Sequence, residues 1–250
     1  MSITITIDGK PCTCERGEYL VDIAKRNDIF IPTLCSMKPV LLERGCCRVC
    51  VVELVEGSRS KVVVSCIYPV ERECEVFTQS EKVVRERGMV LALLGLLAPD
   101  AKLIAQLSKA YQAPELSRLE PNAEGGTCIL CGRCIDACSK LGTSAIAAMN
   151  RGVSKEINTA YGKPAPACIG CASCSNVCPT ESIPVKETDT TRTIWNQDFE
   201  LARCEVCGEV LGTVASLEHA AKLSGNEPDY HCPAHERKHL AQSFSNIYRP

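Results

Sequence analysis

The segments TCILCGRCIDAC at residues 127–138 and ACIGCASCSNVCP at residues 167–179 decide how this chain is organised. Each contains four cysteines with the spacing C-x2-C-x2-C-x3-C. Thiolates at every third residue can wrap a short loop around one face of a compact inorganic centre, whereas neighbouring thiols on one tight loop suit distant disulfide partners poorly. The two segments therefore indicate metal or cluster binding.

This spacing is the cysteine run of bacterial two-cluster ferredoxins, in which the fourth cysteine of each copy ligates the cluster of the other copy. A single copy is also compatible with a zinc knuckle pair, but two identical copies in one segment argue against zinc. Small residues at Gly132, Gly170 and Ala172 would let backbone N–H groups approach the sulfurs. The sequence thus predicts two 4Fe–4S clusters, the first held by Cys128, Cys131, Cys134 and Cys178, the second by Cys168, Cys171, Cys174 and Cys138.

Nineteen cysteines among 250 residues dominate the composition, and the formal net charge is −2. The odd cysteine count and the lack of an export signal in MSITITIDGK argue against a disulfide scaffold. Charges are scattered, so we expect neither nucleic acid nor a membrane as partner. The longest apolar run, residues 89–98, is shorter than the roughly 20 residues of a membrane span. We therefore expect a soluble, cytoplasmic protein.

The first 80 residues predict a β-rich domain. Isoleucines alternate with polar residues over positions 3–7, which is typical of a half-buried strand, and Asp8-Gly9 favours a hairpin turn. The other predicted elements are a strand through residues 12–14, a helix over 19–24 and strands over 49–54 and 61–64. Strand, hairpin, helix and returning strands are the ingredients of a β-grasp domain.

Residues 81–112 show helical periodicity, interrupted at Ala98-Pro99-Asp100. We expect two helices here, with Asp100 as the N-cap of the second. They are best interpreted as a packed connector, followed by a polar linker over residues 114–126.

Four cysteines before the connector fit a 2Fe–2S site: Cys35, Cys47, Cys50 and Cys66. The stretches IPTLC, GCCRVCVVEL and VVVSCIYPV closely resemble the 2Fe–2S domain of the large iron–sulfur subunit of respiratory complex I and the small diaphorase subunit of NAD-linked hydrogenases. Those families have Gly-Ala-Cys-Arg-x-Cys, so Cys46 stands where alanine is usual and the resemblance selects Cys47 as ligand. Spacing alone leaves Cys46 open.

The remaining cysteines lack a metal-type partner spacing. We interpret Cys12, Cys14 and Cys74, together with Cys46, as small buried hydrophobes.

Over residues 1–190 the chain resembles the electron-relay subunit of NAD(P)-linked nickel–iron hydrogenases, including electron-bifurcating ones, and of related formate dehydrogenases. CILCGRCIDAC carries this likeness further along the chain. Between LALLGLLAPD and Cys128 there is no histidine or cysteine, so the complex I cluster bound by one histidine and three cysteines is not expected. The large catalytic domain of iron-only hydrogenases is not expected either.

The carboxy-terminal segment carries a second kind of site. Cys204-x2-Cys207-Gly208 and Cys232-x2-His235 form two knuckles, which predict a tetrahedral structural zinc site. A further iron–sulfur cluster is the alternative. His231 and His239 are possible substitutes for His235, and His219 is expected at the surface.

No G-x-G-x-x-G fingerprint follows a predicted strand, and no nucleophile–base pair or pair of catalytic carboxylates is evident. Hydride exchange requires a cofactor that such a chain lacks. The resemblance implies a relay that is not catalytic alone, carrying single electrons between a flavin-containing NAD(P)H dehydrogenase subunit and a second catalytic subunit such as a hydrogenase.

Three alternatives remain open. The chain could serve a formate or aldehyde oxidoreductase complex, because the terminal substrate is set on another chain. It could be a stand-alone multi-cluster ferredoxin. A zinc-rich regulatory protein would share the cysteine count, although the charge and the repeated spacing oppose it. The predicted architecture is α+β with four parts: a 2Fe–2S β-grasp domain (1–80), a helical connector and linker (81–126), a two-cluster ferredoxin-like domain (127–190) and a zinc-binding module (191–250).

Overall fold

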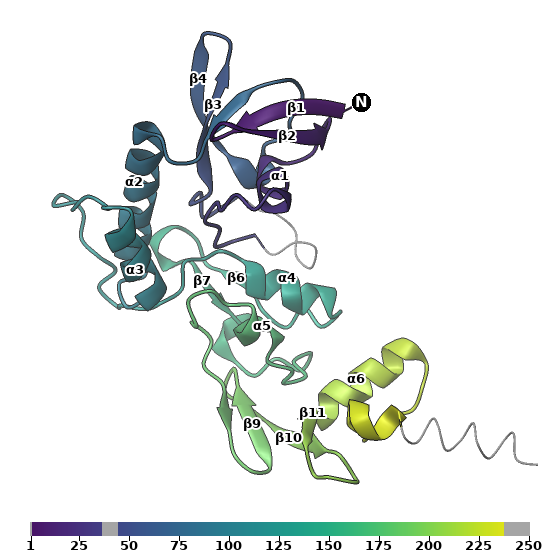
Figure 1. Ribbon diagram of the computed structural model, residues 1–250. Helices are drawn as coiled ribbons and strands as arrows, with labels where there is room; N and C mark the ends of the chain where they lie inside the picture. The colour runs from purple at the N-terminus through teal and green to yellow at the C-terminus, as the bar shows by residue number, and fades with distance from the viewer. Residues whose placement is uncertain (1, 37–44, 238–250) are drawn as a thin grey trace, which may run out of the picture. The chain divides into compact units, whose positions relative to one another are not determined.

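The computed structural model describes residues 2–36 and 45–237 (Figure 1). The chain folds as two compact units. The first contains residues 1–136 and 177–182, and the second contains residues 137–176 and 183–250. Each unit combines helices with sheet strands, as an α+β chain should. The division into four parts stays a prediction.

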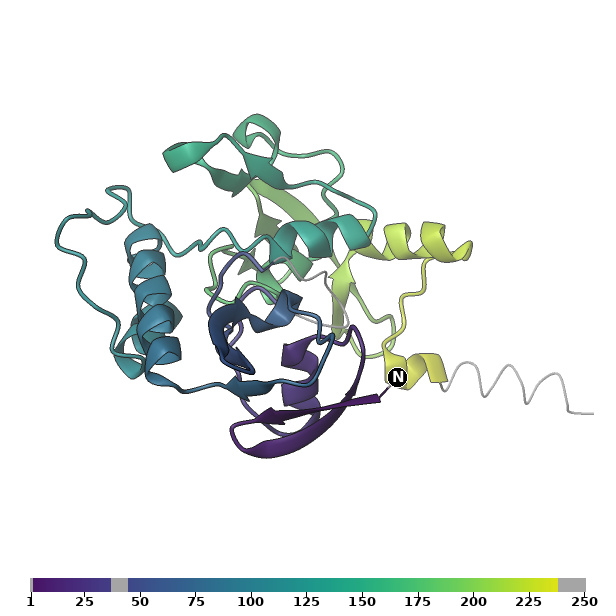
Figure 2. The ribbon, with the colours of Figure 1, turned by 90° about the horizontal axis from the view of Figure 1, so that it is seen from above.

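A five-stranded sheet with the order β2-β1-β5-β3-β4 forms the base of the first unit. Its strands are β1 (Ser2–Ile7), β2 (Lys10–Glu15), β3 (Val51–Glu56), β4 (Arg59–Val64) and β5 (Glu75–Phe77). Only the β1–β5 pair is parallel. Helix α1 (Leu20–Arg26) packs beside β2 (Figure 2). Its buried Leu20 and Ile23 join Ile5 and Ile7 in one core.

The elements predicted for the first 80 residues are therefore present, with one addition. Strand β5 was not predicted, because three residues are too few to show an alternating pattern. Its pairing with both β1 and β3 joins the two hairpins into one sheet. The 3-10 turn η1 (Ser65–Ile67) follows β4.

Two helices, α2 (Glu81–Leu97) and α3 (Lys102–Ala110), pack together beside this sheet. Ser80 caps α2 by accepting a hydrogen bond from the Val83 amide at 3.3 Å. The predicted cap of α3 is wrong. Ala101 occupies the N-cap position, and the Asp100 carboxylate instead accepts a 2.7 Å hydrogen bond from the Gly126 amide, which ties down the linker.

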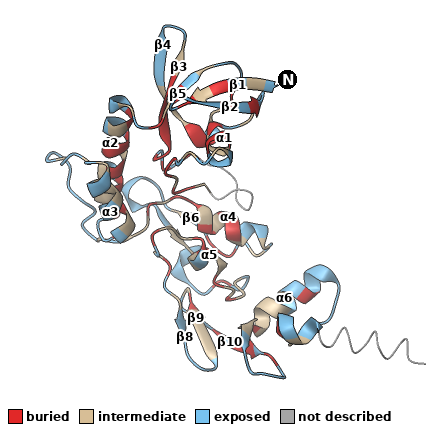
Figure 3. Cartoon of the chain, viewed as in Figure 1, coloured by how far each residue is buried: buried red, intermediate tan, exposed pale blue. Residues whose placement is uncertain are grey.

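The connector is also part of a second core. Leu91 of α2 and Ile104 of α3 are buried together with Cys47, Ile129 and Cys131. Figure 3 shows burial along the side of α2 and in β3. The helices thus form a wall for two cysteine-bearing loops, in addition to joining segments of the chain.

Helix α4 (Arg133–Lys140) begins in the first cysteine run, and its residues 133–136 belong to the first unit and 137–140 to the second. The elements that follow it lie in the second unit, beginning with those around the short helix α5 (Ser173–Asn176) of the second cysteine run. Between them lie the hairpin β6 (Ala147–Met149) and β7 (Glu156–Asn158), with the 3-10 turns η2 (Gly152–Ser154) and η3 (Ala160–Gly162).

A four-stranded sheet of order β11-β10-β9-β8 completes the second unit. Its elements are β8 (Lys186–Glu187), β9 (Thr191–Ile194), β10 (Gln197–Arg203) and β11 (Val210–Thr213), followed by helix α6 (Val214–Ser224). Thr213 caps α6 in a capping box with Ser216, and Gly225 ends the helix at φ 73°. None of the described helices is long and apolar enough to cross a membrane.

Candidate metal centres

The β3–β4 hairpin positions two of the cysteines predicted to hold the 2Fe–2S cluster. Cys50 directly precedes β3, and Cys66 lies in η1 just after β4. Pairing of Val51 with Val64 brings these two ends of the hairpin together. Ser65 then donates two hydrogen bonds to the Cys50 carbonyl oxygen, from its amide at 3.1 Å and from its hydroxyl at 2.7 Å. The register of one hairpin therefore sets the approach of Cys50 to Cys66.

Cys35 and Cys47 lie beside this pair. The exposed fractions of Cys35, Cys47, Cys50 and Cys66 are 2, 4, 1 and 1%. Hydrogen bonds from the thiols of Cys46, Cys47 and Cys66 hold the pKa of Cys35 far below its usual range. Hydrogen bonding to Cys66 lowers the pKa of Cys50 to about 7. The structure thus brings all four predicted ligands into one dry group of thiols, which is the donor set of a 2Fe–2S centre.

Cys46 differs from its neighbour Cys47 in exposure and in partners. Cys47 is buried, and the backbone of Val49 and Leu34 hydrogen-bonds to its sulfur. Cys46 is exposed, and its thiol donates to the Cys131 carbonyl oxygen at 3.2 Å. Both thiols nevertheless interact with Cys35. The choice between them remains a prediction, and burial with N–H···S contacts favours Cys47.

A buried arginine lies against the same loop, and no pattern in the sequence pointed to it. Arg87 of α2 has 0% exposure and donates to the carbonyl oxygens of Val49 (3.0 Å), Val51 (2.7 Å) and Thr78 (3.3 Å). Its guanidinium also lies over the Tyr111 ring, 4.8 Å from the centroid. Burial lowers the pKa of Arg87, but a guanidinium stays protonated at neutral pH. A positive charge is therefore fixed beside β3 and the residues that precede it, which include Cys50.

The cysteines predicted to hold the first 4Fe–4S cluster lie in the first unit. This unit contains Cys128, Cys131 and Cys134 and also residues 177–182, which carry Cys178. Burial raises the pKa of Cys131, and the charges of Cys178 and Cys128 add to that rise. The Ser182 amide donates to the Cys178 sulfur at 3.2 Å. The fourth cysteine of the second copy is therefore grouped with the first copy.

The second set lies in the second unit. This unit contains Cys168, Cys171 and Cys174 together with Cys138 from the first copy. Burial raises the pKa of Cys168 and of Cys174, and the charge of Cys138 contributes to both shifts. The Ala145 amide donates to the Cys138 sulfur at 3.2 Å. A cavity is lined by all four of these cysteines, as a cluster site requires.

The carboxy-terminal sheet covers the loop that carries the second set. Phe199 of β10 packs onto Gly170 so closely that an added Cβ would overlap the phenyl ring. Arg192 of β9 donates to the Gly170 carbonyl oxygen at 3.0 Å, and the Thr213 hydroxyl donates to the Ile169 carbonyl oxygen at 2.5 Å. Gly170 is therefore required by its φ of 64° and by Phe199, in addition to the predicted approach of N–H groups to sulfur.

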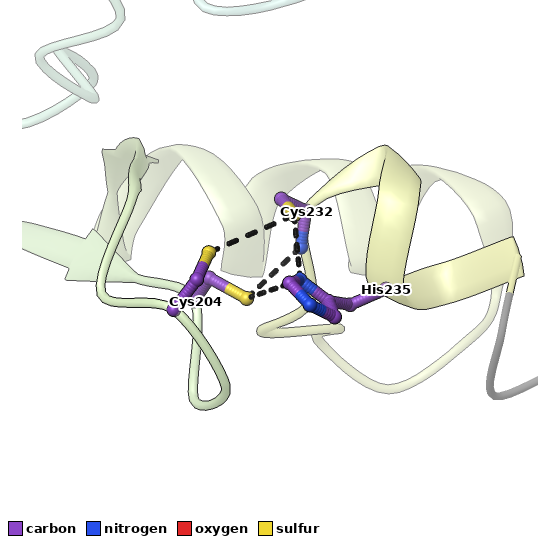
Figure 4. Close-up of side chains that lie close together, drawn as sticks. Cys204, Cys232 and His235 are labelled. Carbon is purple, nitrogen blue, oxygen red and sulfur yellow. Dashed lines mark hydrogen bonds between the residues drawn. The ribbon is translucent and has the colours of Figure 1, made fainter.

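Three cysteines and a histidine converge near the carboxy terminus. Figure 4 shows three of the four, Cys204, Cys232 and His235. The ligand atoms of Cys204, Cys207, Cys232 and His235 all lie within 4.8 Å of one another. His235 Nδ1 is 3.6 Å from Cys204 Sγ and 3.0 Å from Cys232 Sγ, and the Cys207 and Cys232 sulfurs are 3.9 Å apart. A tetrahedral zinc ion places such atoms about 3.5–3.8 Å apart, given its usual bond lengths. The donor set and its spacing fit zinc.

Each knuckle has the local geometry of a ligand loop. The Gly208 amide donates to the Cys204 carbonyl oxygen at 2.8 Å, and Gly208 itself has a φ angle of 75°. The His235 amide donates to the Cys232 carbonyl oxygen at 2.8 Å. Burial acts to raise the pKa of Cys204, but hydrogen bonds from the backbone of Cys232 and Cys207 lower it to about 6. A thiol of this kind is readily available as a thiolate ligand.

Neither of the other described histidines takes the place of His235. His231 pairs with the Asp229 carboxylate at 2.7 Å, and this hydrogen bond raises the pKa of His231. His239 lies outside the described residues. The surface role predicted for His219 is wrong, because its ring is half-buried and lies 2.6 Å from the Leu141 carbonyl oxygen.

The cysteines predicted to be plain buried residues divide into three cases. Cys12 and Cys14 are buried in the first core, as predicted. Cys74 is half-buried, and burial raises its pKa to about 11. The prediction of burial is wrong for Cys46, because this residue is exposed and its thiol donates to the Cys131 carbonyl oxygen.

Comparison with known families agrees with this geometry. Residues 1–81 match the family described as a 2Fe-2S iron-sulfur cluster binding domain, and residues 127–182 match the 4Fe-4S dicluster domain. The chain therefore contains two iron–sulfur domains. Neither matched segment includes the Cys204–His235 group, so the comparison leaves its metal open.

Several relatives of this iron–sulfur chain are named as components of NAD(P)-linked oxidoreductases. It is 32% identical over 210 residues to the HndD component of the NADP-reducing hydrogenase of Solidesulfovibrio fructosivorans (72% of this chain, 36% of the relative). It is 42% identical over 96 residues to the gamma chain of the NAD-reducing hydrogenase HoxS of Cupriavidus necator (38% of each). A component of the NADH-quinone oxidoreductase of Streptomyces coelicolor is 24% identical over 263 residues (91% of this chain, 30% of the relative).

The fold has a counterpart among solved structures. A chain of an NAD+-reducing [NiFe]-hydrogenase, crystallised in the H2-reduced state, matches with a TM-score of 0.60 and 24% identity over 73% of this chain and 86% of that one. The resemblance to hydrogenase and complex I subunits predicted from the sequence is confirmed. The chain spans only about a third of the length of the curated relatives named above.

Proposed function

We propose that this chain relays single electrons through one 2Fe–2S and two 4Fe–4S clusters, between a flavin-containing NAD(P)H dehydrogenase subunit and a second catalytic subunit, a hydrogenase. One observation carries the proposal: twelve cysteines fall into three groups of four, and each group lies within a single unit. Clusters of this kind exchange electrons one at a time, whereas hydride chemistry needs a nicotinamide or flavin.

The proposed ligands are those expected from spacing and resemblance. Cys35, Cys47, Cys50 and Cys66 hold the 2Fe–2S cluster. The first 4Fe–4S cluster uses Cys128, Cys131, Cys134 and Cys178, and the second uses Cys168, Cys171, Cys174 and Cys138. Backbone N–H groups at Leu130, Ala145 and Ser182 donate to ligand sulfurs, which stabilises the negative charge of a cluster.

The layout suits a relay. Cys134 and Cys138, proposed ligands of different 4Fe–4S clusters, are one turn apart in α4, which is about 6 Å along a helix axis. An electron therefore has a short covalently connected route from one cluster to the other. The Cys46–Cys131 hydrogen bond gives a similar route from the 2Fe–2S loop to the first 4Fe–4S loop.

In this proposal, partner subunits carry out the reactions that deliver electrons to the relay and take electrons from it. The relatives' names point to NAD(P)-reducing hydrogenases, and a formate or aldehyde oxidoreductase complex is the alternative, because nothing in this chain selects the terminal substrate. Exposed or half-buried free thiols, such as those of Cys46 and Cys74, fit a reducing cytoplasmic compartment. The Cys204–His235 group holds one structural zinc ion in this proposal.

Anaerobic reconstitution tests the relay. The full chain is expected to bind about ten irons, from one 2Fe–2S and two 4Fe–4S clusters. Dithionite should bleach its visible absorbance, and EPR should resolve three reduced species. Electron transfer is then measured by mixing the oxidised chain with NADH and a flavin-containing dehydrogenase subunit of a related hydrogenase. Colourless, redox-silent protein after oxygen-free reconstitution would contradict the proposal.

A further inference from the structure

The side chain of Trp195 carries a buried donor that the fold leaves unsatisfied. Its indole Nε1 is buried, and it has no hydrogen-bond partner of normal geometry in the described part of the chain. A buried N–H group without an acceptor is destabilising, because it has lost its hydrogen bonds to water. Such a group calls for an explanation, and a role toward a nearby ligand sulfur is one.

A tight turn fixes where this side chain lies. Trp195 and Asn196 connect β9 to β10, and Ile194 pairs with Gln197 across the turn. Both turn residues have positive φ angles, 54° and 56°, which is the type I′ geometry of two-residue hairpins. Tryptophan is uncommon in this strained conformation. The turn therefore holds the indole in one place at an energetic cost.

The indole lies in the wall of the second cluster cavity. Trp195 and Ile194 line that cavity together with the four cysteines proposed as ligands, Cys138, Cys168, Cys171 and Cys174. Among these cysteines, Cys174 is the one whose sulfur interacts with the Trp195 side chain. The donor thus faces the sulfur of a proposed ligand.

Other contacts of the same sheet hold the wall in position. Phe199 packs on Gly170, and Arg192 and Thr213 donate to the carbonyl oxygens of Gly170 and Ile169. Strand β10 then runs directly to Cys204 of the carboxy-terminal metal group. The segment after the dicluster domain is therefore built onto the second cluster loop.

We propose that the Trp195 indole N–H donates a hydrogen bond to the Cys174 sulfur of the second 4Fe–4S cluster and raises the reduction potential of that cluster. This inference rests on the proposed function. Reduction adds negative charge to the cluster and its thiolates, and a donor aimed at a ligand sulfur stabilises the reduced state more than the oxidised one. Trp195 is a tuning residue here, and it does not ligate iron.

The test compares Trp195→Phe with the unchanged chain, both reconstituted anaerobically. Phenylalanine keeps an aromatic ring in the wall and removes only the donor. EPR-monitored redox titration should show the midpoint of one 4Fe–4S species falling by about 59 mV, a tenfold change in its one-electron equilibrium constant. Tyr161→Phe is the matched control, because it removes a hydroxyl from an exposed ring of the same unit and should shift nothing.

A second measurement needs no substitution. Trp195 is the chain's single tryptophan, so 15N-indole labelling marks this one nitrogen. Pulsed EPR of the reduced labelled chain should detect a 15N coupling to one 4Fe–4S species, and Cys138→Ser should remove that coupled species. Normal iron content with two 4Fe–4S signals, but no 15N coupling and no shift in Trp195→Phe, would overturn the inference. Loss of 4Fe–4S signals from the unchanged chain would instead contradict the proposed function.

Discussion

The thiol of Cys46 donates a 3.2 Å hydrogen bond to the carbonyl oxygen of Cys131, 85 residues away in the sequence. The contact joins the loop that carries Cys47 to the first ferredoxin loop. Arg133 adds a second link between the same two loops, donating to the Leu34 carbonyl oxygen at 3.2 Å. The proposed 2Fe–2S cluster and first 4Fe–4S cluster are therefore held by loops that bind one another.

Substitution of the adjacent cysteines tests the ligand choice. Cys47→Ser should abolish the 2Fe–2S EPR signal, because Cys47 is buried and receives backbone hydrogen bonds at its sulfur. Cys46→Ser should leave the signal in place, since a hydroxyl can still donate to the Cys131 carbonyl oxygen. The opposite pattern would show that Cys46 is the ligand.

The crossed ligand sets predict paired losses. Cys138→Ser and Cys168→Ser should both remove the same 4Fe–4S EPR species, and Cys178→Ser and Cys128→Ser should both remove the other. The reason is that each pair lies within one unit. If Cys138→Ser removed the species lost in Cys128→Ser, the copies would bind their clusters without crossing.

Alanine substitutions at two glycines of the second unit distinguish the cost of backbone strain from the cost of overpacking. Gly162 and Gly170 have nearly equal φ angles of 63° and 64°, but an added Cβ at Gly162 has no neighbour closer than 4.0 Å, whereas at Gly170 it meets Phe199. Gly162→Ala should cost about 1–2 kcal/mol from the left-handed backbone. Gly170→Ala should cost roughly 1–3 kcal/mol more, from overpacking.

The readout for these glycines is the thermal midpoint at which the chain's visible absorbance bleaches. Gly170→Ala should lower it more than Gly162→Ala does, and should also lower the occupancy of the second 4Fe–4S cluster. Equal effects of the two substitutions would mean that Phe199 yields easily and does not hold the loop.

Arg87 tests the role of a buried positive charge. Arg87→Met removes the donors to the carbonyl oxygens of Val49, Val51 and Thr78, each worth about 1–3 kcal/mol when left unsatisfied. The variant should unfold at clearly lower urea concentration, and its 2Fe–2S potential should fall. Arg85→Met is the control, because Arg85 is on the same helix with a side chain 72% exposed.

A third variant separates charge from hydrogen bonding at this position. Arg87→Lys keeps the positive charge but cannot reach three carbonyl groups with a planar fork. Its free energy of unfolding should fall. The fall in its 2Fe–2S reduction potential should be smaller than the fall in Arg87→Met, because the positive charge is kept. Equal potentials in both variants would remove the electrostatic role.

Metal analysis tests the carboxy-terminal group. The reconstituted chain should contain about one zinc ion, and Cys204→Ser should lose it, because three protein ligands are a poor closed site. Iron beyond the amount required by three clusters, lost in the same variant, would mean a fourth iron–sulfur cluster. Glu205→Gln is the control, since it changes a neighbouring exposed residue outside the group.

Local patterns in the sequence were sufficient for much of this protein. Alternation in residues 3–7 indicated a strand, the break at Pro99 separated two helices, and repeated C-x2-C spacing marked the metal centres. These features depend on neighbours a few residues apart, because thiols on one short loop reach one centre whatever surrounds them. The resemblance to hydrogenase subunits followed from the same local stretches.

Long-range contacts decided the rest. Strand β5, the burial of Arg87, the exposure of Cys46 and the half-buried His219 each depend on a partner more than twenty residues away, to which no periodicity refers. The placement of Trp195 beside Cys174 is of the same kind. Sequence by itself determined which atoms can bind metal. The tertiary structure decided which dipoles and charges surround those atoms, because packing brings electrostatic neighbours together whatever their spacing along the chain.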